Sequence, residues 1–177
     1  MLDRDAVLRA LETLADALAA REIEGRLFLV GGAAMAIAFD ARRTTRDIDA
    51  IFEPKAEIYR AAQEVAHQLE LPDDWLNDAV RGFMPGTDPD AVPVFVRPGL
   101  TVTAASARFL LAMKLRAARA EQDAGDIKFL VALLGIRTSD EVLRVVSDRY
   151  DAAELPPRAR LLIEELLGPA SIDKMDD

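Results

Sequence analysis

Apolar side chains recur at helical spacing in two segments near the start of the chain. In the first they are Val7, Leu8, Leu11, Leu14, Ala15 and Leu18, and in the second Ile58, Ala62, Val65, Ala66 and Leu69. Each stripe predicts an amphipathic helix packed on a core, over residues 2–21 and 55–70. The pattern changes between them, because residues 26–30 form a short apolar run that ends at a double glycine. Such a run is typical of a buried strand.

The double glycine is followed by the clearest alternation in the sequence. Ala33–Phe39 has the small and apolar residues of a short buried helix, and residues 47–52 then alternate as a second strand. The strand period of two places Asp47 and Asp49 on one face and the apolar residues on the other. We therefore expect one face of this strand to join the core and the other to present two carboxylates.

Proline and glycine interrupt residues 71–90, where one short helix is expected over 73–80. It contains the only tryptophan, Trp75, which either anchors the core or stacks on a nucleobase. Two short strands are predicted over 92–96 and 100–103, joined by a turn. The rest is helical, over 107–121, 127–134, 141–147 and 158–167, with Ser106, Asp126 and Thr138 or Ser139 as caps of the first three.

These elements predict an α/β (α+β) protein, with a small mixed sheet and flanking helices in residues 1–104 and a helical region in residues 105–177. The chain of 177 residues is 51% hydrophobic, enough to bury a full core. No apolar run approaches the roughly 20 residues that span a bilayer, and the acidic, amphipathic first helix lacks the pattern of a signal peptide. Because cysteine is absent, we expect no disulfide or thiolate chemistry and a cytoplasmic protein.

The glycine turn and the paired aspartates both indicate phosphate chemistry. Gly31 and Gly32 let the backbone come close to a ligand, and the N–H groups of the following helix attract phosphate. Asp47 and Asp49 repel each other unless a cation lies between them, and Mg²⁺ binds such oxygens while completing its shell with substrate phosphates. Together the two motifs predict a phosphate site beside a metal-binding pair. Either motif alone is more often a plain turn or a solvated strand edge, and only the two together, in this order, are specific.

Gly31-Gly32, a short helix and then Thr44-Thr45-Arg46-Asp47-Ile48-Asp49 resemble the nucleotidyltransferase superfamily that includes DNA polymerase β. More narrowly, the arrangement is similar to small bacterial proteins related to the toxin of the AbiE abortive-infection system. The resemblance implies that Asp47 and Asp49 are catalytic and hold Mg²⁺ or Mn²⁺. It also implies a set of residues that bind the nucleoside triphosphate (NTP): Gly31, Gly32, Arg43, Thr45 and Arg46.

The resemblance extends to residues 113–130, MKLRAARAEQDAGDIKFL. Carried over by position, Lys114 is a catalytic lysine that faces phosphate and Asp126 is the catalytic acid of the next helix, with Asp123 as a weaker candidate. The lysine ammonium suits this role because it is a mobile point charge. The alternative is an ion pair between Lys114 and Asp126 that ties two helices together. The sequence departs from the superfamily in one respect, since no Asp or Glu occurs in residues 91–106, where a third strand acid was expected.

The net charge of −9 argues against wide, non-specific binding of nucleic acid. Positive charge gathers locally, at Arg42, Arg43 and Arg46 near the aspartates and at Lys114 and Arg116 on a later helix. These residues either surround one site or are ordinary solvated charges.

The expected function is therefore that of a metal-dependent nucleotidyltransferase, which moves a nucleotide from an NTP to an acceptor. The resemblance suggests RNA, especially tRNA, as the acceptor and an antitoxin as a partner protein, within a toxin–antitoxin or phage-defence system. One alternative is a non-catalytic binding or scaffold protein with the same fold. Another is an enzyme that modifies a small molecule such as an antibiotic.

Overall fold

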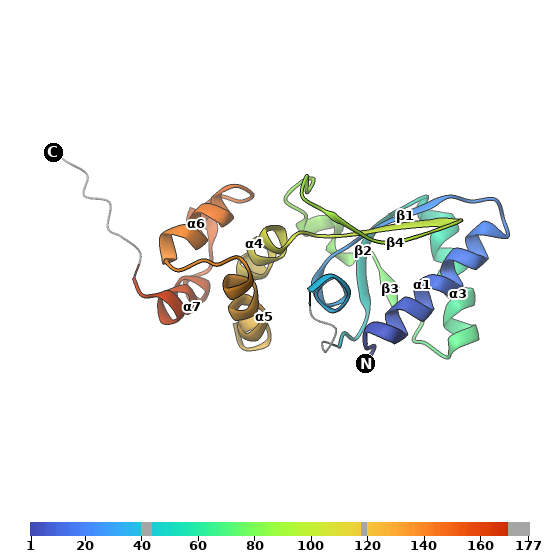
Figure 1. Ribbon diagram of the computed structural model, residues 1–177, viewed down its shortest axis with the longest axis horizontal. Helices are drawn as coiled ribbons and strands as arrows, with labels where there is room; N and C mark the ends of the chain where they lie inside the picture. The colour runs from blue at the N-terminus through green and yellow to red at the C-terminus, as the bar shows by residue number, and fades with distance from the viewer. Residues whose placement is uncertain (40–43, 118–119, 170–177) are drawn as a thin grey trace. The chain divides into compact units, whose positions relative to one another are not determined.

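The computed structural model describes residues 1–39, 44–117 and 120–169 of the chain. The chain divides into two compact units, Met1–Met84 with Asp88–Ser106, and Pro85–Thr87 with Ala107–Asp177. The first unit contains a five-stranded mixed sheet with helices, and the second is helical (Figure 1). The expected α+β fold class is thereby confirmed.

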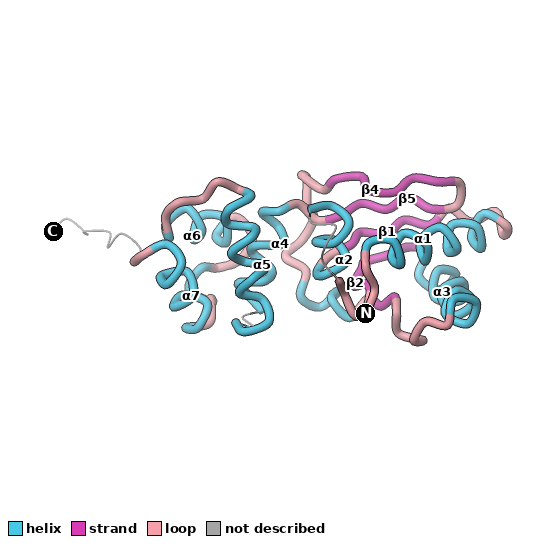
Figure 2. The backbone as a smooth tube through the Cα atoms, turned by 60° about the horizontal axis from the view of Figure 1, so that its bottom comes forward, coloured by secondary structure: helices cyan, strands magenta, loops and turns pink. Residues whose placement is uncertain are grey.

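The sheet of the first unit has the strand order β3-β2-β1-β5-β4. Its strands are β1 (Gly25–Leu29), β2 (Ile48–Glu53), β3 (Leu76–Asn77), β4 (Val92–Arg97) and β5 (Leu100–Ala104). β1 runs antiparallel to β2 and parallel to β5, while the two edge strands pair in parallel (β3 with β2) and antiparallel (β4 with β5). The strands lie side by side as a single sheet in Figure 2.

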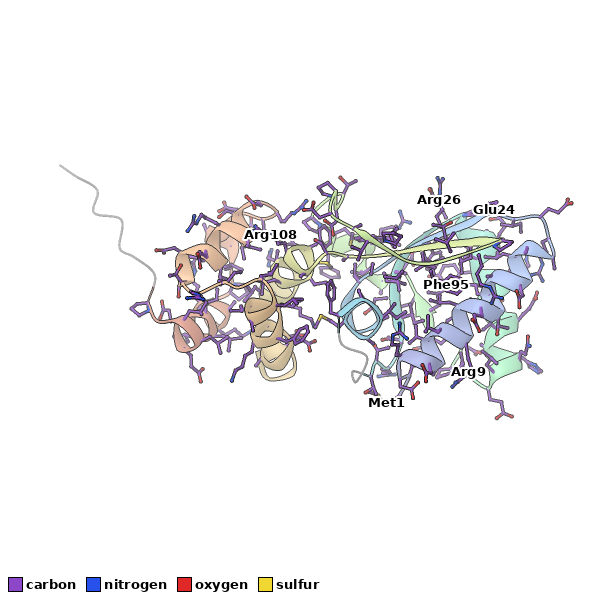
Figure 3. All side chains as sticks on the ribbon, in the orientation of Figure 1. Met1, Arg9, Glu24, Arg26, Phe95 and Arg108 are labelled. Carbon is purple, nitrogen blue, oxygen red and sulfur yellow. The ribbon has the colours of Figure 1, made fainter. Side chains whose placement is uncertain are left out.

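One face of this sheet forms the core. The residues paired across β2, β1 and β5 on that face are buried: Ile48, Ala50, Phe52, Leu27, Leu29, Leu100, Val102 and Ala104. Helices α1 (Arg4–Ala19) and α3 (Lys55–Leu69) pack against each other over it. The opposite face is more open, and there the exposed Arg26 and Glu53 form a cross-strand ion pair of 2.8 Å; Figure 3 shows the Arg26 side chain pointing away from the sheet.

The connection between β1 and β2 contains two short helical segments. The α-helix α2 covers Gly31–Ala34, and a π-helical turn, η1, covers Met35–Phe39. Ala33 through Ile37 are buried, as the short apolar pattern predicted. A β-bridge between Leu2 and Thr45 then returns the chain to the sheet.

The segment before β4 differs from the expected helix over residues 73–80. Instead, β3 is followed by a 3₁₀ helix, η2 (Ala79–Phe83). The physical reason is Trp75, which is fully buried and whose indole donates to the carbonyl of Ala62 at 2.9 Å. Its own carbonyl accepts from the N–H of Ile48 at 2.6 Å, which holds the chain extended beside β2. The interpretation of Trp75 as a core anchor is confirmed.

The second unit consists of α4 (Ala107–Ala117), α5 (Ala120–Leu133), α6 (Ser139–Ser147), a 3₁₀ turn η3 (Ala152–Glu154) and α7 (Pro157–Leu167). The expected start of a helix at Asp126 is wrong, because this residue lies inside α5. α5 ends at Leu133 and is followed by Gly135 in the left-handed conformation, with the N–H of Gly135 donating to Ala132 and the N–H of Ile136 donating to Val131. Thr138 caps α6 in a reciprocal capping box with Glu141, as one of the two predicted caps.

Within the residues that the structure describes, no helix combines the length and the apolar character needed to cross a lipid bilayer.

Gly99, in the turn between β4 and β5, allows a first test of this packing. It has a φ of +83°, and a Cβ there would lie 2.6 Å from the carbonyl of Ala15 and from the N–H of Ala19 in α1. Gly99→Ala is expected to destabilise the protein by about 2–5 kcal/mol, since a left-handed alanine costs about 1–2 kcal/mol and overpacking against backbone about 1–3 kcal/mol. Urea unfolding measures the effect.

The matched control is Gly86→Ala, because Gly86 also has a positive φ (+107°) but open space around it. We expect it to show only the conformational cost of about 1–2 kcal/mol. Equal destabilisation by the two variants would contradict the close contact between the β4–β5 turn and α1.

Candidate functional site

The two aspartates lie at the beginning of β2 on the open face of the sheet. Asp47 directly precedes the strand and Asp49 is its second residue, and both are half-buried. The buried face of the same strand carries apolar residues only, so the predicted division into a core face and a carboxylate face is confirmed. This arrangement follows from the strand period, since burial of one set of side chains places the other set opposite.

Thr45 holds the backbone that leads into this pair. Its side chain is buried (8% exposed), and its hydroxyl donates to the carbonyl of Asp47 at 2.8 Å. Its own N–H and C=O pair with the C=O and N–H of Leu2 at 2.8 and 2.6 Å. Thr45, which the resemblance placed among the nucleotide-binding residues, thus fixes the approach to the first carboxylate.

The double glycine lies against this region. Gly31 has a φ of +60°, and a Cβ there would lie 3.1 Å from Oδ2 of Asp49. A Cβ on Gly32 would lie 2.6 Å from Oγ1 of Thr45. The absence of a side chain at Gly31 thus lets the turn lie close to Asp49, and its absence at Gly32 makes room for the packing of Thr45.

Asn77 also lies beside the two aspartates, although the sequence analysis did not predict it as a site residue. It is the Cα partner of Asp49 in the parallel β2–β3 ladder, and its Nδ2 lies 3.4 Å from Oδ2 of Asp47. A third acidic residue was sought in residues 91–106, and this segment contains β4 and β5, which lie on the other side of β1 from β2. β3 has only two residues and therefore shows no periodicity in the sequence. The apolar Trp75 directly before it is the only signal of a buried segment there.

Asp78, the next residue, is held by several donors. The hydroxyl of Tyr59 donates to its Oδ1 at 2.6 Å, Nζ of Lys55 lies 2.6 Å from its Oδ2, and Nε of Arg81 lies 3.5 Å from the same oxygen. The bonds from Lys55, and next from Tyr59, hold the pKa of the Asp78 carboxyl below its usual value. Burial, together with the bond to Asp78, raises the pKa of Tyr59.

Lys114 and Asp126 belong to the second unit, where they meet in an ion-pair cluster. Nζ of Lys114 lies 2.7 Å from Oδ1 of Asp123 and 2.7 Å from Oδ2 of Asp126, which are one turn apart on α5. The lysine side chain is 12% exposed and each aspartate 14%. The ion pair that the sequence left open as an alternative is therefore present, and it includes Asp123 as a second carboxylate.

Two arginines, Arg43 and Arg46, were predicted to bind the nucleotide. Arg46 is exposed just before the aspartates, whereas Arg43 lies outside the described residues. Among residues 1–39, 44–117 and 120–169, no group of three or more Asp, Glu, His or Cys side chains is arranged to hold a metal ion.

Mg²⁺ or Mn²⁺ nevertheless fits the chemistry of the donors present. Asp47 and Asp49 offer carboxylate oxygens, which these hard cations prefer, and Mg²⁺ commonly takes one or two carboxylates and completes its shell with water and phosphate oxygens. Any side chain at Gly31 would cover Oδ2 of Asp49. A residue without a side chain is therefore needed where the turn approaches Asp49.

Comparisons of the chain with protein-family models, with curated proteins and with solved structures found no match. The nucleotidyltransferase assignment accordingly rests on the residues themselves and stays a proposal.

The Asp78 cluster predicts a dependence of stability on pH. A carboxyl whose pKa is lower in the folded than in the unfolded protein stabilises the fold above its unfolded pKa of about 3.9, and this contribution is lost as pH falls through the folded pKa. We expect Asp78→Asn to destabilise the protein at pH 7, and its gap to the wild type to narrow as pH falls below about 4 toward the folded pKa. Urea unfolding between pH 3 and pH 7 measures this, with the exposed Asp73→Asn as control. A gap between the wild type and Asp78→Asn that stays constant over this range would contradict the pairing.

The Lys114 cluster predicts a stability effect in the second unit. Lys114→Met leaves two carboxylates side by side without their cation and should cost roughly 3 kcal/mol, as expected for removing one partner of a buried pair. Adding Asp123→Asn to Lys114→Met removes the repulsion and should recover part of the loss. Urea unfolding followed by helical circular dichroism measures both. Unchanged stability of Lys114→Met would show that the ion pair is not structural.

Proposed function

We propose that the protein is a metal-dependent nucleotidyltransferase that moves a nucleotide from an NTP to an acceptor. The observation that carries the proposal is the pair Asp47 and Asp49, half-buried on the open face of β2, with the left-handed Gly31 directly against Asp49. Two carboxylates on one strand face are costly without a cation, and the turn approaches Asp49 closely through a residue that has no side chain. A structural strand edge requires neither feature.

Each residue has a role in this proposal. Asp47 and Asp49 hold Mg²⁺ or Mn²⁺, which when bound stabilises the charge on the entering and leaving oxygens of phosphoryl transfer. Gly31 and Gly32 let the backbone approach the triphosphate. The cationic side chains of Arg43 and Arg46 neutralise the phosphates.

RNA, especially tRNA, is the acceptor that we propose, with an antitoxin as a protein partner and the cytoplasm as the setting. The acceptor hydroxyl attacks the α-phosphorus of the NTP and pyrophosphate leaves, so that the RNA gains one nucleotide. The net charge of −9 requires that the RNA contact be local.

A second candidate function is that of a non-catalytic binding or scaffold protein. The observation that favours it is the pairing of Lys114 with two carboxylates, which gives this lysine a structural task in the second unit. In that case the aspartate pair binds neither metal nor nucleotide.

Thermal unfolding separates these two functions. Mg²⁺ with an NTP should raise the melting temperature of the wild type by about 5 °C or more, since a ligand at 100 times its Kd stabilises by about 2.7 kcal/mol. Asp49→Asn should abolish the rise, while the exposed Asp73→Asn should keep it. No rise in the wild type with any NTP favours the scaffold.

Transfer is then followed with α-labelled NTPs, Mg²⁺ and total RNA. Label should enter RNA, and Asp47→Asn and Asp49→Asn should each remove the signal because either leaves the metal short of a charged ligand. Label that persists in the double variant would come from a contaminating enzyme and would contradict the assignment. Label found in a small molecule would identify the small-molecule nucleotidyltransferase instead.

A further inference from the structure

The pairing of β3 with β2 places Asn77 beside the two aspartates. β3 pairs in parallel with the beginning of β2, with Leu76 opposite Ile48 and Asn77 opposite Asp49. Leu76 and Ile48 are buried on the core face, so Asn77 shares the open face with Asp49. Asn77 is the only asparagine of the chain.

The amide of Asn77 has a defined orientation. Its Oδ1 accepts from the backbone N–H of Ala79 at 3.1 Å, which leaves the NH₂ group to point the other way. That group donates to Oδ2 of Asp47 at 3.4 Å. The backbone bond therefore identifies the amide as a donor toward the first carboxylate.

Helix α3 holds the chain on both sides of Asn77. The carbonyl of Ala62 accepts from the Trp75 indole, and Lys55 and Tyr59 bind Asp78. The three helix residues follow one another at intervals of four and three, so they lie along one side of α3. The two neighbours of β3 are thus tied to the same helix, which keeps Asn77 in register with Asp49.

We propose that Asn77 is the third member of the aspartate site, a positioning residue that orients Asp47 and limits the site to two negative charges. The inference rests on the proposed function, because it assigns the charge of the same metal site. An amide donates a hydrogen bond to Asp47 without adding negative charge. A carboxylate at the same place would add a third acidic side chain and would increase the demand of the site for cations.

Asn77→Asp tests this directly, because aspartate keeps the acceptor for Ala79 and changes only the NH₂ group. In a chelating buffer we expect a lower melting temperature than that of the wild type, since three carboxylates then face one another. With Mn²⁺ alone and no nucleotide, we expect at least tenfold tighter binding than the wild type shows, measured by calorimetry and by thermal shift. The matched control is Gln68→Glu, which adds the same charge on the exposed side of α3.

Asn77→Ala provides the second measurement. It removes the donor to Asp47, and we expect the affinity for Mn²⁺ in the presence of an NTP to fall about three- to tenfold, with the melting temperature in chelator changed little. An Asn77→Asp protein that binds Mn²⁺ no better than Gln68→Glu would overturn the inference, and so would full Mn²⁺ affinity in Asn77→Ala. A wild type that ignores Mg²⁺ and NTP, while Asn77→Asp binds Mn²⁺ through Asp47 and Asp49, would defeat the proposed function and leave the placement of Asn77 standing.

Discussion

Burial of one face of β2 determines where both carboxylates lie. Ile48 and Phe52 are essentially inaccessible to solvent, and each such side chain contributes about 1.5–3 kcal/mol when fully buried. Two like charges on the open face repel by about 1–3 kcal/mol at separations near 6 Å and intermediate dielectric constants. Burial therefore outweighs repulsion, and a slip of one residue in register, which would expose the apolar set, is excluded. The fold itself holds the two aspartates together.

Helix α3 extends this constraint to the edge of the sheet. A strand of two residues has too few ladder bonds to be stable alone, yet β3 stays beside β2 because its flanking residues are bound to α3. The buried indole of Trp75 supplies apolar contact before β3, and the ion pair between Asp78 and Lys55 holds the chain after β3. The third polar residue of the site is thus positioned by groups that do not touch the aspartates.

Local patterns in the sequence account for most of the fold. Long stripes predicted α1 and α3, and alternation predicted both faces of β2, because each depends on side chains a few residues apart. β3 was not predicted, because its direction depends on a hydrogen bond between Trp75 and Ile48, which are distant in the sequence and adjacent in space. Asp126 was predicted to start a helix, whereas it lies inside α5 and pairs with Lys114. The glycines and aspartates of the candidate site were predicted because they lie within one short stretch of sequence. Asn77 was missed because its position depends on the pairing of β3 with β2.

The bridge between Leu2 and Thr45 makes the amino end of the chain part of the site's support. Thr45 pairs with Leu2 through its backbone and donates its hydroxyl to the carbonyl of Asp47. Thr45 therefore links Leu2 to the backbone of the first aspartate. A displacement of Leu2 would reach the backbone of Asp47 through Thr45.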